Sequence, residues 1–402
     1  MSSKSVLKSL LFWIVVAIAA GIACSFFFPT WLARVFVTFN GIFFGFLGFF
    51  VPVLIFALIT PAIAGLGKGA GKWLGITAGI AYGSTIVSGL IAWGVSAALY
   101  PSLLGNQTLI TAVDDIDEGA LSPYFEIEME PPFAVLTGLL LAFCVGVAMT
   151  SVQSATMHKF FEEFESVIMK VVSSFIIPLL PVAIFGMFLS LGMNDNLGST
   201  MAAFGKVLVL AIVMTILLII VQYLIAGAIA GVNPFVALKN MLPAYFTALG
   251  TSSSAATIPV TLRSTLTNKV DENVAGFVVP LCATIHLSGS MMKIGLYTFA
   301  IIFMSNMDVS PALTLGFILM LGIMMIAAPG VPGGAIMAAT GLLASMLGFD
   351  DNMVGLMIAA YIVIDSFGTA ANVTGDGAIA LVVNRFASGK LEGVHAAEED
   401  RR

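Results

Sequence analysis

Residues 311–345 read PALTLGFILMLGIMMIAAPGVPGGAIMAATGLLAS, an apolar stretch that has no charged residue and is interrupted near its centre. The interruption, at residues 328–334, contains proline and glycine, the two residue types that most often end a helix. Exposed backbone is not tolerated in lipid, so such a break must be buried in protein or line a cavity. The stretch therefore predicts a re-entrant helical hairpin of a membrane protein.

The composition of the whole chain indicates the same class. Of its 402 residues, 59% are hydrophobic and 9% are charged, and the mean hydropathy is +1.07. A water-facing surface needs about 25–35% charged residues. Four intervals contain no Asp, Glu, Lys or Arg: residues 35–67, 73–113, 207–238 and 309–349. Each is longer than the ~20 residues that cross a bilayer as a helix, so we expect an all-α polytopic membrane protein.

Eight apolar segments are typical of spanning helices: residues 9–29, 38–66, 74–100, 132–153, 167–192, 201–231, 271–305 and 352–384. A ninth, residues 235–262, is broken at Gly250-Thr251-Ser252-Ser253-Ser254 and resembles the stretch at 311–345. The fold class is therefore eight transmembrane helices plus two re-entrant helical hairpins. Paired broken segments in corresponding parts of a chain are typical of a transporter with a binding site near the bilayer midplane.

Positive charges predict the orientation, because cytoplasmic loops carry an excess of Lys and Arg. With eight spans, most of these charges fall on the side of both termini, and the acidic loop at 101–131 falls outside; Arg34 and Lys206 are exceptions. We expect a multi-pass protein of the cell membrane with both termini in the cytoplasm. A net charge of −6 without a basic cluster argues against a nucleic-acid partner. Three cysteines without C-x-x-C spacing predict neither a disulfide nor a metal site.

Four polar residues of the last span lie on one helical face. Asp365, Thr369, Asn372 and Asp376 follow one another at intervals of four, three and four residues, which places them in one stripe about three turns long. Such a stripe can be a polar seam between helices, in which Thr and Asn are common. Two carboxylates, each costing at least ~2.5–3.5 kcal/mol near the bilayer centre, favour a ligand or ion path.

Lys293 and His286 are further candidates, both inside the span at 271–305. Lys293 could place its ammonium at the membrane surface only if this span were strongly tilted. His286 is either a neutral core histidine or a proton carrier, because histidine changes its charge near neutral pH.

The tips of the two predicted hairpins supply hydroxyls and free backbone groups. The serines at 252–254 would present O–H and N–H groups at a half-helix end, which suits a carboxylate, although a flexible apex would use the same residues. The glycines of residues 330–334 would let the second tip close over a ligand or pack tightly. Pro329 and Pro332 break the helix at the same place and favour the first role.

Four strings together resemble the dicarboxylate/amino acid:cation symporter family, the glutamate and neutral amino acid transporters. They are FVPVLIFAL at 50–58, TSSSAATIP at 251–259, GVPG at 330–333 and NVTGD at 372–376. They occur in the family's order and spacing, and the resemblance extends over nearly the whole chain. It implies a secondary active transporter, specifically a cation-coupled symporter, and not an enzyme.

The resemblance also implies a homotrimer that works as an elevator in the lipid bilayer. Residues 1–73, with spans one and two, and residues 132–198, with spans four and five, would form a static scaffold. Residues 74–131, with span three and the extracellular loop, would belong to the moving transport unit. Residues 199–390, with spans six to eight and both hairpins, would complete that unit, and residues 391–402 would form a cytoplasmic tail.

Several roles follow from the resemblance, residue by residue. Asp365 matches the aspartate that pairs with the α-amino group of the substrate. Asn372 and Ser254 match the positions that hold its α-carboxylate, and Asn372 and Asp376 match ligands of one sodium site. The predicted substrate site comprises Ser253, Ser254, Ser290, Gly330, Val331, Pro332, Gly333, Asp365, Gly368, Thr369 and Asn372.

One departure from the family bears on the substrate. Gly368 stands where members that carry acidic substrates have an arginine, and without a guanidinium no obvious group pairs with a second carboxylate. A small neutral amino acid such as serine, threonine or alanine is therefore predicted. An acidic amino acid or a dicarboxylate is the alternative.

A second departure bears on the coupling ion, for which we expect Na⁺ or H⁺. The string HLSGS at 286–290 replaces the family's Asn-Met-Asp-Gly-Thr, so at least one sodium site has lost its charge. Asp376 remains, and a buried carboxylate needs a positive partner. We hypothesise that Lys293, alone or with His286, balances it and takes over part of sodium's role, so that fewer sodium ions, or protons, are used. Alternatively, backbone carbonyls still form ordinary sodium sites.

Two other functions compete with a transporter. A membrane-embedded serine hydrolase could combine a serine of 252–254 with His286 and Asp365, but no G-x-S-x-G string frames the serine. The broken helices have no use in that mechanism. A channel is disfavoured because no repeated ring of pore residues can be identified in the sequence.

Overall fold

The computed structural model describes residues 10–66, 71–105, 121–152, 154–193, 197–326, 328 and 332–387. Within these residues the chain is helical and contains no strand. The helices are α2 (Leu10–Ser25), α3 (Thr30–Leu66), α4 (Gly71–Leu103), α5 (Val135–Val152), α6 (Ala155–Val171), α7 (Ile177–Gly192), α8 (Leu197–Ala230), α9 (Pro234–Thr251), α10 (Ser254–Thr267), α11 (Glu272–Ile285), α12 (Ser288–Met304), α13 (Pro311–Ile326), α14 (Gly334–Leu347), α15 (Asp351–Val363) and α16 (Asp365–Ala387). A short π-helical turn, Val172–Ile176, joins α6 to α7.

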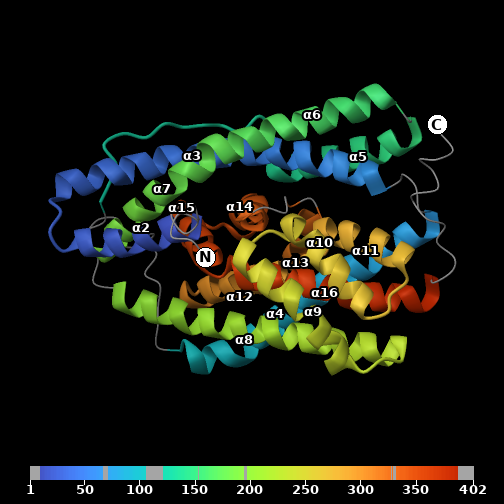
Figure 1. Ribbon diagram of the computed structural model, residues 1–402. Coiled ribbons are helices and arrows are strands. Elements are labelled where there is room, and N and C mark those ends of the chain that lie inside the picture. The colour runs from blue at the N-terminus through green and yellow to red at the C-terminus, as the bar shows by residue number, and fades with distance from the viewer. Residues whose placement is uncertain are drawn as a thin grey trace.

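The helices form two groups that lie side by side (Figure 1). Helices α3, α5, α6 and α7 run along the top of the view and pack on one another, and α2 packs on α7. Helices α4, α8, α9, α12 and α16 run along the bottom and are also mutually packed, with α14 between the two groups. The predicted division into a static scaffold and a moving transport unit stays a prediction.

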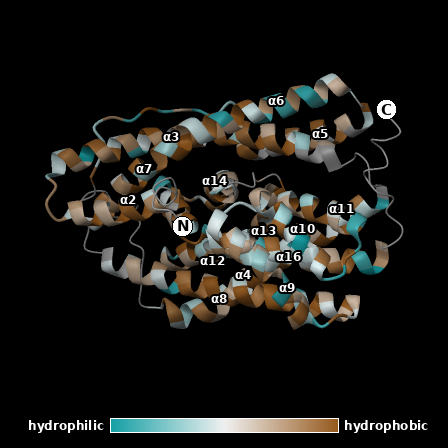
Figure 2. Cartoon of the chain, in the orientation of Figure 1, coloured by the Kyte–Doolittle hydropathy of each residue, from teal (hydrophilic) through white to brown (hydrophobic). Residues whose placement is uncertain are grey.

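The outer surface of these helices is apolar. Large hydrophobic side chains such as Leu140 of α5, Val209 of α8 and Phe246 of α9 are at least 60% exposed. Figure 2 shows hydrophobic colouring along most of α3, α5 and α8. Five helical runs are long and apolar enough to cross a membrane, or up to six if α15 and α16 form one span. A polytopic helical membrane protein is thus supported, whereas the number of eight spans stays a prediction.

The two predicted helix breaks are present. The first falls between α9 and α10, where Ser252 has a φ of 50° and the Ser253 side chain accepts a hydrogen bond from the Ala256 N–H as the N-cap of α10. The second falls between α13 and α14, where Gly333 has a φ of 75°, a conformation that glycine adopts without strain. Gly330 and Val331 lie outside the described residues. Re-entry of these helix pairs into a membrane stays a prediction.

Two further breaks were not predicted, because residues 271–305 and 352–384 were expected to be continuous spans. Helix α11 ends at Ile285, and α12 starts at Ser288 after His286 and Leu287 have left helical geometry. Helices α15 and α16 meet at Ile364 with a bend of 62°. Neither break contains proline or glycine. Side chains of other helices bind the freed backbone groups instead, as described below.

Arg34 and Lys206, the exceptions to the charge pattern, both bind backbone carbonyls. The Arg34 guanidinium donates to the carbonyls of Ser122 and Pro123 and lies 4.4 Å from the centre of the Tyr124 ring. The Lys206 ammonium donates to the Leu103 carbonyl at the last turn of α4. A cation at a helix C-terminus stabilises its unpaired carbonyls. These contacts account for the positions of both basic residues.

Candidate functional site

The polar stripe of the last span is carried entirely by α16, which begins at Asp365. Asp365, Thr369, Asn372 and Asp376 are all buried, between 1% and 6% exposed. Helix α16 packs against α8, α9, α10, α11 and α12, so the stripe lies inside the lower group of Figure 1. The Thr369 hydroxyl donates to the Asp365 carbonyl of its own helix, whereas the other three side chains contact the broken helices.

Asn372 caps the start of α12. The first N–H groups of a helix have no partner within it, and the N-cap residue Leu287 has no side-chain hydrogen bond to offer. The Asn372 Oδ1 accepts from the N–H groups of Gly289 (2.7 Å) and Ser290 (3.3 Å). Its Nδ2 donates to the Ser290 hydroxyl, which also accepts from the Tyr361 hydroxyl at 3.0 Å. Asn372 thus supplies hydrogen bonds to N–H groups that the helix break at 286–287 leaves without a partner.

Asp365 binds the second hairpin tip. Its Oδ2 accepts a 2.8 Å hydrogen bond from the N–H of Gly333, which immediately precedes α14. A carboxylate at a helix N-terminus is stabilised by the positive end of the helix dipole. The structure therefore connects two predicted site residues, Asp365 and Gly333, and holds the tip against α16.

Lys293 caps the break between α15 and α16. Its side chain is completely buried, and its ammonium donates to the carbonyls of Ile364 and Asp365, both at 3.2 Å. The same ammonium lies 3.4 Å from Asp365 Oδ1 and 3.9 Å from the centre of the Tyr361 ring. Lys293 therefore forms an ion pair with Asp365 and also binds the carbonyls that the bend leaves free.

His286 forms the second buried pair. Its Nδ1 lies 2.9 Å from Asp376 Oδ1, and both side chains are at most 1% exposed. The His286 Nε2 lies 3.1 Å from the Ser84 hydroxyl of α4. Gln222 of α8 donates to Ser84 and to Ser288, both at 3.0 Å. This cluster, Ser84, Gln222, His286, Ser288 and Asp376, joins α4, α8, α12 and α16.

The hypothesis that Lys293, alone or with His286, balances Asp376 is correct for His286 and wrong for Lys293. Lys293 was placed near Asp376 because seven residues separate it from His286, which puts the two on one face of a continuous helix. The helix instead breaks between them, so that His286 pairs with Asp376 and Lys293 pairs with Asp365. Each buried carboxylate therefore has its own cationic or N–H donor partner.

Ser84, Gln222 and Tyr361 were not among the predicted site residues. Gln222 is a polar residue in the middle of α8, an otherwise apolar helix, and burial of its side chain among apolar neighbours requires hydrogen-bond partners. That signal could have identified it. Ser84 carries no such signal, because serine hydroxyls inside a helix commonly bond to their own backbone.

The side-chain hydrogen bonds at the serine-rich tip of α9–α10 lie mostly within the tip itself. The Ser253 hydroxyl oxygen accepts a hydrogen bond from the Ala256 N–H. The Thr257 hydroxyl donates to the Ser253 carbonyl. Ser254 is buried at the start of α10, which packs against α16. Roles of Ser253 and Ser254 in binding a carboxylate stay predictions.

Asn372 and Asp376, the predicted sodium ligands, use most of their oxygens in hydrogen bonds within the protein. The Asn372 Oδ1 already accepts two backbone N–H groups, and Asp376 Oδ1 is taken by His286. Asp376 Oδ2 has no hydrogen-bond partner among the described residues. Ligation of sodium by these two side chains stays a prediction.

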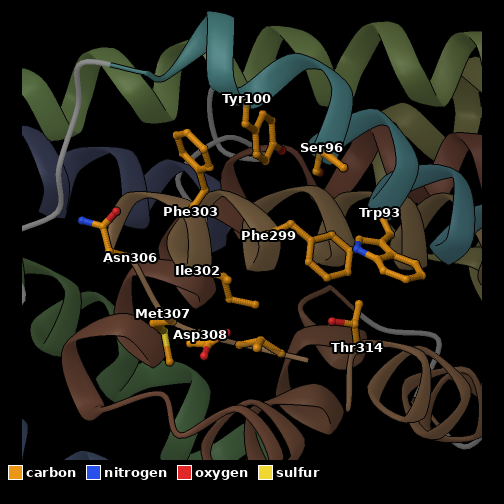
Figure 3. A pocket seen from close by; sticks show the side chains of 12 residues that line it. Trp93, Ser96, Tyr100, Phe299, Ile302, Phe303, Asn306, Met307, Asp308 and Thr314 are labelled. Carbon is orange, nitrogen blue, oxygen red and sulfur yellow. The ribbon is translucent and has the colours of Figure 1, made fainter. Parts of the chain in front are cut away.

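Two of the larger cavities formed by the described residues lie near these helices. One, of about 240 Å³, lies between α4, α8 and α16 and reaches Ser84 and Gln222. The other, of about 480 Å³, lies at the ends of α4 and α12, where Figure 3 shows Trp93, Tyr100 and Phe299 around it. The second cavity contains none of the predicted site residues, so its position does not support a role as the substrate site.

A close helix contact supports the Asn372 cap and gives a first prediction. A Cβ added at Gly289 would lie 2.5 Å from the Gly368 carbonyl oxygen and 2.7 Å from the Ala371 Cβ. Gly289→Ala is expected to push α12 away from α16 and destabilise the protein by about 1–3 kcal/mol, measured by thermal unfolding in detergent. Gly276→Ala on α11, where a Cβ meets no atom within 4 Å, is the matched control and should be neutral or stabilising. Equal melting temperatures for both variants would contradict the expectation.

The fold and site define a helical membrane protein in which several broken helices meet around a buried, charged centre, the arrangement typical of secondary transporters. Comparison with known proteins assigns the family: the model of the sodium:dicarboxylate symporter family matches residues 10–386, and the chain belongs to this family. It is a family of transporters, not of enzymes, and membership implies sodium as the coupling ion.

The curated relatives are named as amino acid transporters. Excitatory amino acid transporter 1 of Rattus norvegicus is 26% identical over 71% of this chain and 55% of its own length. Excitatory amino acid transporter 3 of Oryctolagus cuniculus is 31% identical over 45% of this chain and 34% of its own length. A putative sodium-dependent excitatory amino acid transporter of Caenorhabditis elegans, glt-4, is 28% identical over 59% of this chain. The chain thus matches about half the length of these relatives or less.

Proposed function

We propose that this chain is a sodium-coupled symporter of an α-amino acid, bound between the tip of α13–α14 and the stripe of α16. The observation that carries the proposal is the Asp365 carboxylate, which is buried and contacts both Gly333 at the start of α14 and the Lys293 ammonium. A substrate ammonium would replace the Lys293 ammonium on Asp365. The substrate carboxylate would bind the N–H groups near the helix ends, together with Asn372.

The substrate class depends on the surroundings of Gly368. A neutral amino acid was predicted because no cation was expected beside this glycine. The Lys293 ammonium lies against Gly368, so the premise of that prediction is weakened. The relatives named as excitatory amino acid transporters also favour the acidic alternative.

The proposal is tested by equilibrium binding to the purified, full-length protein. Titrations of L-aspartate, L-glutamate, L-serine, L-alanine and succinate, each with sodium or with choline as the cation, would be followed by calorimetry. We expect at least one amino acid to bind in sodium and to bind much more weakly in choline. Absence of binding by every amino acid, or binding indifferent to sodium, would contradict the proposal.

The pair His286–Asp376 supports a proposal about coupling, namely that the imidazole takes the place of one coupling cation at this carboxylate. His286→Asn removes the imidazole and introduces an amide oxygen, the kind of ligand that hard cations prefer. We expect sodium binding to this variant, measured by calorimetry in the absence of substrate, to involve an additional ion. A sodium isotherm identical to that of the unmodified protein would contradict the proposal. His158→Asn, on α6, is the matched control.

Assembly and movement follow the same proposal. A homotrimer in the cell membrane, with cytoplasmic termini and elevator movement of the transport unit, is what the resemblance implies. The exposed apolar side chains of α5, such as Leu140, Val147 and Val152, suit contact with lipid or with a second copy of the chain. Chemical crosslinking in native membranes would test the trimer.

A serine hydrolase is not supported. The contact of His286 is with Ser84 rather than with a serine of the hairpin tip, and its other ring nitrogen faces Asp376 rather than Asp365. Ser84 lies inside the continuous helix α4, where backbone N–H groups are used within the helix and none is free to stabilise an oxyanion.

A further inference from the structure

Lys293 reaches the substrate stripe from a helix other than the one that carries it. The lysine belongs to α12, and its ammonium crosses to α16, where it lies beside Asp365 and above the Tyr361 ring. No other Lys or Arg among the described residues is completely buried. Lys293 is therefore the buried basic side chain that lies beside the polar stripe of α16.

The ammonium also fills the space beside Gly368. A Cβ added to this glycine would overlap the Cε and Nζ atoms of Lys293. Any side chain at position 368 would thus compete with the lysine for one volume. Glycine at position 368 thus leaves the room that the Lys293 side chain occupies. The positive charge at this place therefore comes from α12 and not from α16.

The charges of Asp365 and Lys293 determine which substrate would leave neither residue without a partner of opposite charge. When a substrate ammonium binds Asp365, the Lys293 ammonium loses its carboxylate partner. Since the α-carboxylate is proposed to bind Asn372 and the N–H groups near the helix ends, a neutral amino acid would leave this buried cation without a counter-charge, which is costly. A dicarboxylate without an amino group would pair with Lys293 but leave Asp365 uncompensated. An amino acid with a second carboxylate supplies a partner to both residues.

We propose that Lys293 is the specificity-determining residue of this transporter and binds the side-chain carboxylate of an acidic amino acid. The inference rests on the proposed function, since it assumes that Asp365 binds the substrate ammonium. Asp365 and Lys293 exchange their mutual contact for contacts with the two ends of the substrate. Gly368 provides the space in which the lysine makes this exchange.

The test compares L-aspartate with L-alanine in equilibrium binding to the purified full-length protein in sodium. Lys293→Met is expected to lower the affinity for L-aspartate by at least about 30-fold, because a buried carboxylate loses its charged partner. The affinity for L-alanine should be unchanged or higher. Lys293→Met/Gly368→Arg returns a cation to the same volume from α16 and should restore most of the affinity for L-aspartate.

Lys293→Met could fail to fold, so a second variant that keeps the lysine is needed. Gly368→Ala places a methyl group where the ammonium lies, so it should also weaken L-aspartate more than L-alanine. Gly276→Ala is its control on an uncrowded helix. Equal loss for both amino acids in Lys293→Met and in Gly368→Ala would overturn the inference and assign Lys293 a structural role.

The unmodified protein separates the two proposals. Tighter binding of L-alanine than of L-aspartate would overturn the role of Lys293 while leaving amino acid symport intact. Binding of neither amino acid would overturn both.

Discussion

Asp365→Asn is expected to weaken amino acid binding by on the order of 30- to 5,000-fold, the equivalent of about 2–5 kcal/mol for a truncated buried charge pair. The asparagine retains the size of the side chain but removes the charge that pairs with an ammonium. It also offers only one oxygen, whereas Asp365 uses one for Lys293 and the other for the Gly333 N–H. Calorimetric titration of the substrate in sodium measures the effect.

Asp351→Asn is the matched control for this variant. Asp351 is an exposed residue in the first turn of α15, whose N-cap is the neighbouring Asp350. The substitution removes one negative charge without touching the polar stripe, so the affinity should remain within about twofold of the unmodified protein. If Asp365→Asn binds the substrate as tightly as Asp351→Asn does, Asp365 does not recognise the ammonium.

His286→Leu is expected to cause the largest loss of stability, about 3–5 kcal/mol, because it leaves the buried Asp376 without its partner. The Asp376 Oδ1 would lose its hydrogen bond to His286, and Oδ2 already has none among the described residues. The Gln222 side chain would also bind a Ser84 hydroxyl that no longer has the imidazole beside it. Thermal unfolding in detergent measures the change.

The double variant His286→Leu/Asp376→Asn separates the pair from the packing of the imidazole. Because the effects of interacting residues are not additive, replacing both partners should recover a substantial part of the lost stability. Additive effects of the two single variants would show that His286 and Asp376 do not stabilise each other.

The predicted membrane class, most helices and two breaks follow from local signals. Long charge-free intervals predict apolar helices, and proline, glycine or clustered serine interrupts α9–α10 and α13–α14. The breaks at His286–Leu287 and Ile364 lack these signals. They exist because Asn372 binds the N–H groups at the start of α12 and Lys293 binds the carbonyls at the end of α15. Contacts between distant helices cannot be obtained from periodicity within one segment.

The site was predicted as a set of residues but not as a set of pairs. Helical spacing correctly placed Asp365, Asn372 and Asp376 on one buried face. The assignment of Lys293 to Asp376 assumed a continuous helix from residue 286 to 293. Because that helix is broken, each basic side chain turns to a different carboxylate, and only the three-dimensional arrangement shows which.

The central claim is that sodium drives an amino acid through a site organised by Asp365. The direct measurement is uptake of tritiated L-aspartate and L-alanine into proteoliposomes with an inward sodium gradient, a proton gradient or no gradient. We expect accumulation above the external concentration with the sodium gradient, and none with Asp365→Asn reconstituted at equal density. Uptake that ignores the sodium gradient, or that persists in Asp365→Asn, would contradict the account.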